Sequence, residues 1–238
     1  NSHSGYYQDF AVQLRVSGFQ VYAMDLQGRG QSQGERYYTA DYNDVLSDID
    51  ALVLIASAAL PSAPVFLFGH SAGGVFAAAY AAQKQYKLKG LISESFAFKI
   101  PAPAFALAAI KFMAHIIPHT RLVKLNNEDF SRDKAHVFKM NNDPLLENEK
   151  QPVKTMQQLL LAGEYLKKQM PEIKLPVLIL HGTADQATEP AGSEYFMANV
   201  ASADKKLKLY EGHYHDLLND KQQGIVISDI LIWLNQRV

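Results

Sequence analysis

The chain has 238 residues, of which 48% are hydrophobic, which is enough for one sizeable domain with a buried core. Its formal net charge is -1, from 23 basic and 24 acidic residues, and no long run of one sign appears. Because phosphate groups are bound by clustered Lys and Arg, we expect no nucleic-acid partner. The chain has no cysteine, which excludes disulfides, thiolate metal sites and a cysteine nucleophile.

Neither a signal peptide nor a membrane span is evident. The longest apolar stretch, residues 105–117, is interrupted by Lys111 and His115 and is shorter than the about 18 residues that a span requires. The chain opens at Asn1 without a methionine, so the sequence leaves a leader open. We expect a cytoplasmic protein.

Strand and helix patterns alternate along the first hundred residues. Apolar spacing predicts a helix within 6–19, with Gly18 near its end, where helices commonly place glycine. A helix over 39–60 is predicted from Val45, Ile49, Leu52 and Ile55, which share one face. The remaining predicted elements here are strands over 20–26, 65–69 and 88–95, a glycine-rich loop over 28–36 and a helix over 73–85.

The last third of the chain continues this alternation, with strands over 176–182 and 207–212 and a final helix over 224–236. Short apolar strands that alternate with helices are typical of a parallel sheet covered on both faces, which predicts an α/β fold. Between 98 and 172 no convincing strand is evident, and one helix is predicted over 153–169. We therefore expect a core formed by 1–97 and 173–238, and a helical insertion over 98–172.

The sequence GHSAG at 69–73 fits the pattern G-x-S-x-G, which places a serine at a sharp turn between a strand and a helix. Side chains two residues away on either side would crowd such a turn, so we expect glycine at 69 and 73 for this reason. The turn exposes the Ser71 hydroxyl, and the N–H of Ala72 is the natural donor to a developing oxyanion. The alternative is that Ser71 only caps the helix, but the strand before it and the helix after it favour a nucleophile.

A serine nucleophile needs a base and an acid that orients the base, and in this type of fold they follow it in the order acid, histidine. Asp185 follows the strand over 176–182, at the edge where ligands bind parallel sheets. Glu189 is the second candidate acid, although its TEP context is more typical of a turn before a helix. His181 at the end of that strand is interpreted as a structural anchor.

Two histidines follow the last strand and are candidates for the base. His215 lies further from the strand than His213, which gives it more reach toward Ser71. His213 remains the alternative, with packing or hydrogen bonding in the loop as its other interpretation.

Five motifs in this order resemble the monoacylglycerol lipase and lysophospholipase branch of the α/β hydrolases, which also includes serine aminopeptidase-like members. The resemblance spans essentially the whole chain and implies that Ser71 is the nucleophile, Asp185 the acid and His215 the base. It is specific for the fold and the triad and weak for the substrate. The motifs are MDLQGRGQSQGER (24–36), FGHSAGG (68–74), FSRDKAHVFKMNNDPLL (130–146), LILHGTADQATEP (178–190) and LYEGHYHDLLND (209–220).

The resemblance also implies a second oxyanion donor on a loop of which residues 1–7 would be the end. That donor would fall immediately before Asn1. We therefore expect a leading segment, with one or more further strands of the sheet, to precede Asn1, because a sheet without it would have an unpaired edge.

In this branch the insertion forms a cap over the active site. Its apolar residues suggest either core packing against the main domain or a lining for an acyl chain, with about 0.8 kcal/mol for each buried methylene. An apolar cap could also touch a membrane surface. The candidate lining residues are Phe105, Phe112, Met113 and Ile116.

We predict a serine hydrolase that cleaves carboxylic esters of single-chain lipids through an acyl-enzyme. No metal and no organic cofactor are implied, and the sequence leaves the oligomeric state open. One alternative is a peptidase or amidase with the same triad, and Glu128, Asp129 and Glu164 offer the acidic groups that would bind a substrate amine. The other is a protein that keeps the fold and binds a ligand without chemistry.

Overall fold

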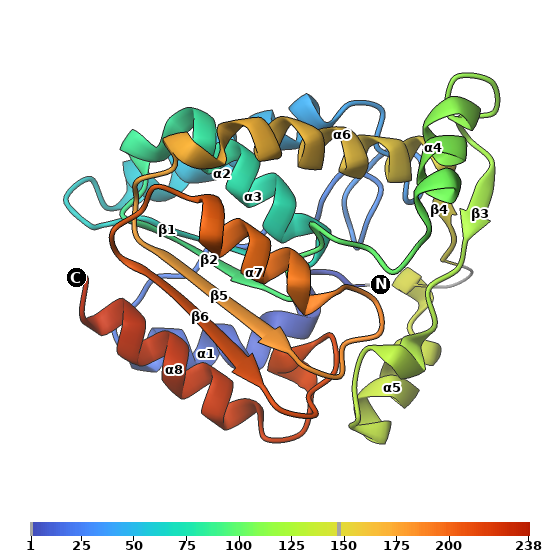
Figure 1. The fold of residues 1–238 in the computed structure, drawn as a ribbon. Coiled ribbons are helices and arrows are strands. Elements are labelled where there is room, and N and C mark those ends of the chain that lie inside the picture. Colours follow the sequence, from blue (N-terminus) through green and yellow to red (C-terminus); the bar gives the residue numbers. More distant parts are fainter. Residues whose placement is uncertain (1, 147–148) are drawn as a thin grey trace.

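The computed structural model describes residues 2–146 and 149–238 and shows a central sheet between two layers of helices (Figure 1). The four strands of the sheet are parallel and lie in the order β1-β2-β5-β6. The predicted parallel α/β sheet is thereby confirmed. The strands are β1 (Phe66–His70), β2 (Gly90–Glu94), β5 (Val177–Gly182) and β6 (Lys205–Tyr210).

Each face of the sheet is covered by its own set of helices, and a separate apolar cluster lies under each set. One cluster joins the sheet to α2 (Tyr42–Ala59), α3 (Ala72–Lys84) and α7 (Pro190–Asn199). The other joins it to α1 (Gln8–Val16) and α8 (Gln223–Asn235). β2 and β5 are buried along their whole length, as central strands covered on both faces should be.

Helix α2 is capped at its start by Asp41, and its buried face differs from the predicted one. The side chain of Asp41 accepts a hydrogen bond from the N–H of Asn43, which satisfies one free donor of the first turn. Val45 and Ile49 are buried as expected, whereas Ile55 is 59% exposed. The buried face is completed by Leu46 and Val53 instead, so the helix presents a face rotated from the predicted one.

The strand predicted over 20–26 was wrong for this structure. These residues form neither helix nor strand, and among the described residues no backbone hydrogen bond joins 20–25 to another strand. A cavity of about 950 Å³ is lined by Val21 to Met24 on one side and by β1 on the other. An apolar pattern favours an extended backbone, but a strand exists only where a neighbouring edge completes its hydrogen bonds.

Residues 98–172, which we expect to form an insertion, contain helices and a small second sheet, and none of the described residues among them joins the main sheet. The helices are α4 (Ala104–Met113), α5 (Lys134–Asn141) and α6 (Val153–Gln169), and α6 has the predicted bounds. Strands β3 (Arg121–Val123) and β4 (Gln151–Pro152) pair antiparallel, so the expectation of no strand here was wrong. Strands of two and three residues are too short to show a two-residue periodicity in the sequence.

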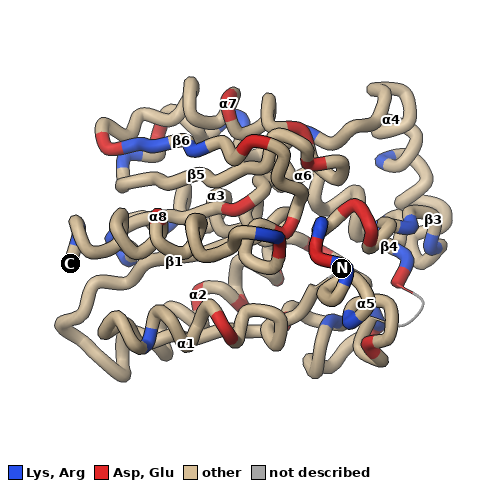
Figure 2. Tube along the Cα trace, turned by 90° about the horizontal axis from the view of Figure 1, so that it is seen from below, with Lys and Arg blue, Asp and Glu red and all other residues tan. Residues whose placement is uncertain are grey.

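Acidic and basic residues are interspersed along the chain, as the trace in Figure 2 shows. Within the described residues, no helix is both long and apolar enough to cross a membrane. The 3-10 turns are Ser4–Tyr7, Gln85–Lys87, Asn127–Asp129, Pro144–Leu146, Met170–Glu172 and Leu217–Asn219.

Candidate active site

Ser71 lies at the turn between β1 and α3 in a backbone conformation that few residues adopt. Its φ is 55° and its ψ is -122°, outside the regions that L-residues usually occupy. Such a conformation persists only where surrounding contacts enforce it. Here the Ser71 N–H donates to the carbonyl of Glu94 on the neighbouring strand, and the Ser71 carbonyl accepts from Gly74.

Two glycines around Ser71 are required by close contacts, and they are not the pair that the motif predicted. A Cβ at Gly69 would lie 2.4 Å from the carbonyl oxygen of Gly73, so a side chain there would collide with backbone. A Cβ at Gly74 would lie 2.2 Å from the hydroxyl oxygen of Ser93. A Cβ at Gly73 would have no atom within 4 Å, so the predicted crowding at 73 was wrong.

The structure brings Ser71, His215 and Asp185 together from the ends of three different strands. Nε2 of His215 lies 2.9 Å from Oγ of Ser71, and Nδ1 of His215 lies 2.8 Å from Oδ2 of Asp185. Both distances are short enough for hydrogen bonds, as expected for a serine activated by a histidine and an acid. With one imidazole nitrogen on the carboxylate and the other on the hydroxyl, His215 can accept the serine proton and Asp185 can orient the ring.

The side chain of Asp185 is buried and held by donors that also keep it ionised. Its Oδ1 accepts hydrogen bonds from the N–H groups of Ala187 and Thr188, and the Thr188 hydroxyl donates to Oδ2 at 2.7 Å. His181 Nε2 also lies 3.1 Å from Oδ2. Burial raises the pKa of Asp185, but the hydrogen bonds from His181, His215 and the backbone outweigh it and hold the pKa well below its usual range.

His215 is buried and remains uncharged more easily than a histidine in water. Burial lowers the pKa of His215 by more than the carboxylate of Asp185 raises it. The ring packs edge-on against Phe130 of the insertion, with 4.8 Å between ring centres. An imidazole that is neutral near pH 7 is in the protonation state that a general base requires.

The amino end of α3 offers a donor for a developing negative charge. The N–H of Ala72 is the first of the helix and has no backbone partner among the described residues. Free N–H groups at a helix start favour an oxyanion, both by hydrogen bonding and through the helix dipole. The second donor that the resemblance implies, before Asn1, lies outside the described residues.

The structure separates the alternative acid and base from Ser71. Nδ1 of His213 lies 3.1 Å from the carbonyl of Glu211 in its own loop, as its structural interpretation expects. Glu189 forms an ion pair with Lys99 at 2.5 Å and precedes α7. His181 does more than anchor a loop, since it contacts both Asp185 and, at 2.7 Å, the hydroxyl of Ser193.

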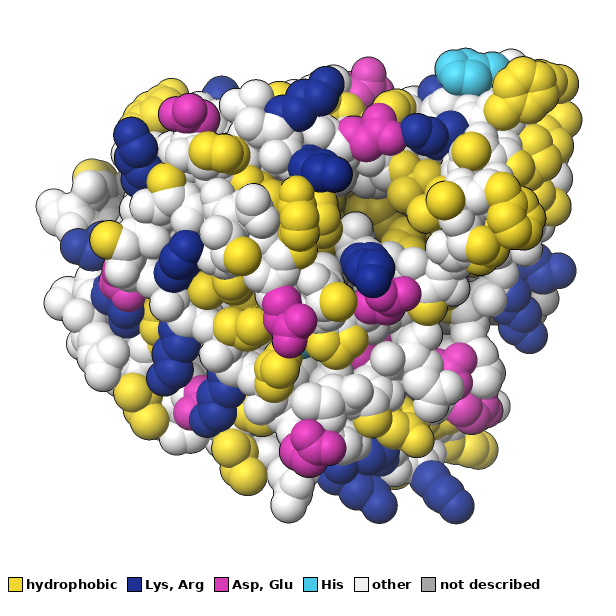
Figure 3. All heavy atoms as spheres, in the orientation of Figure 1, with side chains coloured by type: hydrophobic (Ala, Val, Ile, Leu, Met, Phe, Trp, Pro, Cys, Tyr) yellow, Lys and Arg dark blue, Asp and Glu magenta, His cyan; other side chains and the backbone are white. Residues whose placement is uncertain are grey.

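The predicted lining residues of the insertion do not meet Ser71 in this structure. Phe105, Phe112 and Ile116 are 77%, 67% and 64% exposed, and they lie on α4 or just beyond it. Neither these residues nor Met113 line the cavity at Ser71. Hydrophobic side chains gather where α4 lies, at the upper right of Figure 3.

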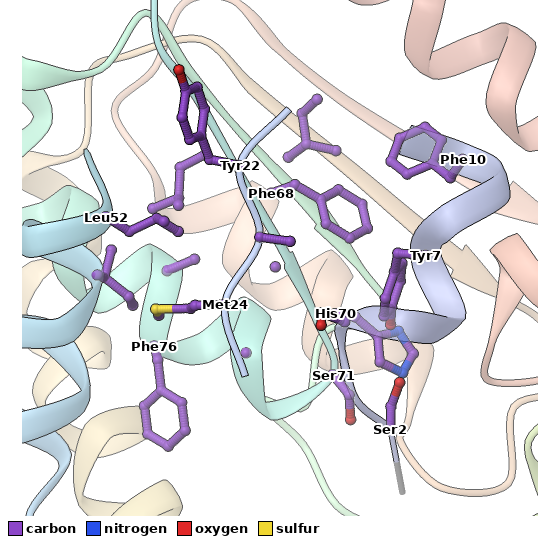
Figure 4. Close-up of a pocket in the computed structure, with 18 of the residues that line it drawn as sticks. Ser2, Tyr7, Phe10, Tyr22, Met24, Leu52, Phe68, His70, Ser71 and Phe76 are labelled. Atoms are coloured by element: carbon purple, nitrogen blue, oxygen red, sulfur yellow. The ribbon is translucent and has the colours of Figure 1, made fainter. Parts of the chain in front are cut away.

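Two cavities lie near the nucleophile. The larger one is lined by Ser71, Ala72 and His215 at one end and extends between β1 and residues 20–26, where Tyr22 and Met24 lie on the side of Leu52 and Phe76 and Phe68 lies on the other side with Phe10 (Figure 4). The smaller one, of about 300 Å³, lies between α4 and α6 and is lined mainly by apolar side chains. Ala97 lines both cavities, and its N–H donates to the Ser71 carbonyl.

Comparison with known proteins identifies the family of the chain. The family described as serine aminopeptidase, S33, matches residues 1–222. The chain is 32% identical over 241 residues to a monoglyceride lipase of Rattus norvegicus, covering 99% of this chain and 80% of the relative. It is 29% identical over 234 residues to a monoacylglycerol lipase of Mycolicibacterium smegmatis, covering 98% and 84%.

A solved structure is also similar over the whole chain. The crystal structure of a monoacylglycerol lipase from Paleococcus ferrophilus has a TM-score of 0.90 and 32% sequence identity, covering 100% of this chain and 91% of that one. The chain therefore belongs to the serine aminopeptidase S33 family of α/β hydrolases, on the branch of the monoglyceride lipases, and is an ester hydrolase.

Proposed function

We propose that the protein hydrolyses esters of single-chain lipids, with monoacylglycerols as the first candidate class and lysophospholipids as the second. The observation that carries the proposal is the continuous contact from Ser71 Oγ through His215 to Asp185. The relatives named monoglyceride lipase support the choice of substrate class, since the chain matches them over nearly its whole length.

The proposed reaction follows from the positions of these groups. His215 removes the proton of the Ser71 hydroxyl as the oxygen attacks the ester carbonyl, and Asp185 stabilises the imidazolium that forms. The oxyanion accepts a hydrogen bond from the N–H of Ala72. His215 then protonates the departing alcohol, and a water molecule, deprotonated by the same imidazole, hydrolyses the acyl-enzyme.

We place the acyl chain in the smaller cavity rather than against the predicted lining residues. Leu107 and Ala108 of α4 and Leu159 and Gly163 of α6 line this cavity, which adjoins Ala97 beside Ser71. A volume of about 300 Å³ suits one alkyl chain better than two. Each methylene that enters would contribute about 0.8 kcal/mol, so chain length should affect the rate.

We further propose that the exposed face of α4 touches the lipid surface from which substrate arrives. Phe105, Phe112 and Ile116 are exposed close together along one stretch of chain, and large exposed apolar side chains favour an interface. This position would bring the cavity between α4 and α6 close to the lipid.

The test compares ester and amide substrates across a series of chain lengths. Purified protein is assayed with monoacylglycerols, lysophospholipids, p-nitrophenyl acyl esters and aminoacyl p-nitroanilides. Ester turnover that is lost by about 10⁶-fold in Ser71→Ala supports the proposal. Faster turnover of the anilides would make the protein a peptidase, and folded protein whose Ser71 is not labelled by a fluorophosphonate would make it a binding protein.

The same series tests the acyl site with a matched pair of variants at Gly163. A Cβ at this position would only reach an ordinary contact, at 4.0 Å from Phe98. Gly163→Ala should therefore keep the chain-length profile, whereas Gly163→Leu should fill the cavity and shift the optimum to shorter chains by two or more carbons. An unchanged profile in Gly163→Leu would remove the acyl chain from this cavity.

A further inference from the structure

A buried polar cluster beside the triad has no part in the reaction described above. It consists of His70 at the end of β1, Glu94 at the end of β2 and Asp216 in the loop after β6. Nδ1 of His70 lies 3.2 Å from Oε2 of Glu94, and one nitrogen or oxygen atom from each of the three residues lies within 4.8 Å of the others. The two carboxylates are buried, and the His70 side chain is 10% exposed.

This cluster contacts both ends of the catalytic machinery. His70 immediately precedes Ser71, and its ring packs edge-on against that of His215, with 4.8 Å between centres and an interplanar angle of 64°. Glu94 holds the loop that carries His215, because its Oε1 accepts the N–H of Leu218 at 3.0 Å. The adjacent Ser95 hydroxyl donates to the His215 carbonyl.

The charges of the cluster follow from its composition. Two buried carboxylates favour a compensating positive charge, and His70 lies against both Glu94 and the ring of His215. Burial lowers the pKa of His70, but the carboxylate of Glu94, and after it Asp216, outweighs burial and raises the pKa overall. The nearby carboxylates therefore favour a proton on His70, while burial also raises the pKa of Glu94.

The other titratable groups around the cluster favour the same arrangement. From α5, Nε2 of His136 lies 3.4 Å from Asp216, and burial of Asp216 is outweighed by His136 and His70, which lower its pKa. On the other side of His70 lies the ring of Tyr7, 6.1 Å away between centres. Burial, followed by the two carboxylates, raises the pKa of Tyr7 well above its usual value, so this phenol is neutral.

We propose that His70, Glu94 and Asp216 form a positioning unit that sets the pH at which His215 becomes a general base. The imidazolium of His70 opposes a second positive charge on His215, and Asp216 favours it. The His70 charge keeps His215 neutral in more acidic solution and makes its imidazolium a stronger acid toward the leaving alcohol, and Asp216 limits this effect. The proposal rests on the proposed function, because it assigns a pH response to the same Ser71–His215 pair.

These charges determine the direction in which each variant should move the acidic limb of the pH profile. His215 must be neutral to act, so kcat/KM falls as the pH drops through the pKa of His215 in the free enzyme. Burial is the main cause that lowers this pKa, while His70 lowers it further and Asp216 raises it. Removing the His70 charge should therefore move the acidic limb to higher pH, and removing the Asp216 charge should move it to lower pH.

The experiment measures kcat/KM of a water-soluble p-nitrophenyl ester against pH for the full chain and three variants. The double variant His70→Gln/Glu94→Gln removes the ion pair and leaves two amides that can bond each other. We expect its acidic limb to shift up by about 0.5–1 pH unit, and that of Asp216→Asn to shift down by a similar amount. His213→Gln, in the same loop, is the control and should not shift.

Circular dichroism and fluorophosphonate labelling at high pH accompany each profile. Limbs that stay in place, or that move in the same direction in both variants, would overturn the proposal even if activity fell. Inhibition by a chelator that is reversed by a divalent cation would also overturn it, since the cluster would then bind a metal. If wild-type protein neither hydrolyses esters nor reacts with the probe, the proposed function fails instead.

Discussion

Residues that the sequence predicts to be functional lie both at the end of the main sheet and on the outer face of α4. The two regions differ in how firmly the structure holds these side chains. Ser71, His215 and Asp185 are fixed by buried contacts from several elements. The apolar side chains of α4 are largely exposed, and no residue of that helix is buried. Several contacts thus fix the positions of the Ser71, His215 and Asp185 side chains, whereas the face of α4 that we propose to meet the lipid is largely exposed.

The largest effect is expected on the rate of the reaction, from a change of Asp185 at the end of the main sheet. Asp185→Asn keeps the size of the side chain but removes the charge that stabilises the imidazolium and selects its tautomer. We expect kcat to fall by about 10⁴-fold with little change in KM. Steady-state kinetics on a short p-nitrophenyl ester would measure this.

Glu189→Gln is the matched control for Asp185→Asn. Glu189 was the other acid that the sequence offered, and its carboxylate pairs with Lys99, with its side chain 34% exposed. We expect activity within about twofold of wild type, because partly exposed ion pairs contribute little. A loss at Glu189 as large as that at Asp185 would contradict the assignment of the acid.

A smaller effect, on stability rather than rate, is expected at the turn that holds Ser71. Gly69→Ala would place a Cβ 2.4 Å from the Gly73 carbonyl oxygen, so either β1 or the start of α3 must move. We expect the free energy of unfolding, measured by urea denaturation, to fall by about 1–3 kcal/mol. A stability equal to wild type would mean that the turn is less tightly packed than the structure shows.

Gly73→Ala tests the same turn with the opposite expectation. A Cβ at Gly73 meets nothing within 4 Å, and the residue lies in the first turn of α3. Alanine forms helix more readily than glycine, so the variant should be as stable as wild type or more stable by about 0.5–1 kcal/mol. The pair of variants separates the glycine that the fold needs from the one that only completes the motif.

The sequence could predict the features that depend on local patterns along the chain. The positions of Ser71, Asp185 and His215 were predictable because each follows a predicted short strand, and parallel strands end at one edge. Their catalytic roles stay predictions until the variants are measured. The helices and the parallel sheet followed from periodicity, which depends on neighbours within one element.

The predictions that failed depend on contacts between distant segments. The extended residues 20–26 have a strand-like pattern but no paired edge among the described residues, which no local pattern reveals. The hydrogen bond from Thr188 to Asp185 and the crowding at Gly74 by Ser93 also become visible only in three dimensions. Glu94 did leave a signal, since a carboxylate at the end of an otherwise buried strand must have a partner.

An effect on membrane binding alone, and not on the reaction, is expected on the exposed face of α4. Phe105→Ser/Phe112→Ser/Ile116→Ser should weaken sedimentation with phosphatidylcholine vesicles by about tenfold or more, because the variant loses apolar area at the interface. Turnover of a water-soluble ester should stay within about twofold, since none of these side chains lines the cavity at Ser71. Phe138→Ser, which changes a phenylalanine that is 70% exposed on α5, is the control for general surface hydrophobicity. Equal loss of vesicle binding in both variants would mean that the lipid contact is not specific to α4, and the proposed orientation of the insertion toward the membrane would be wrong.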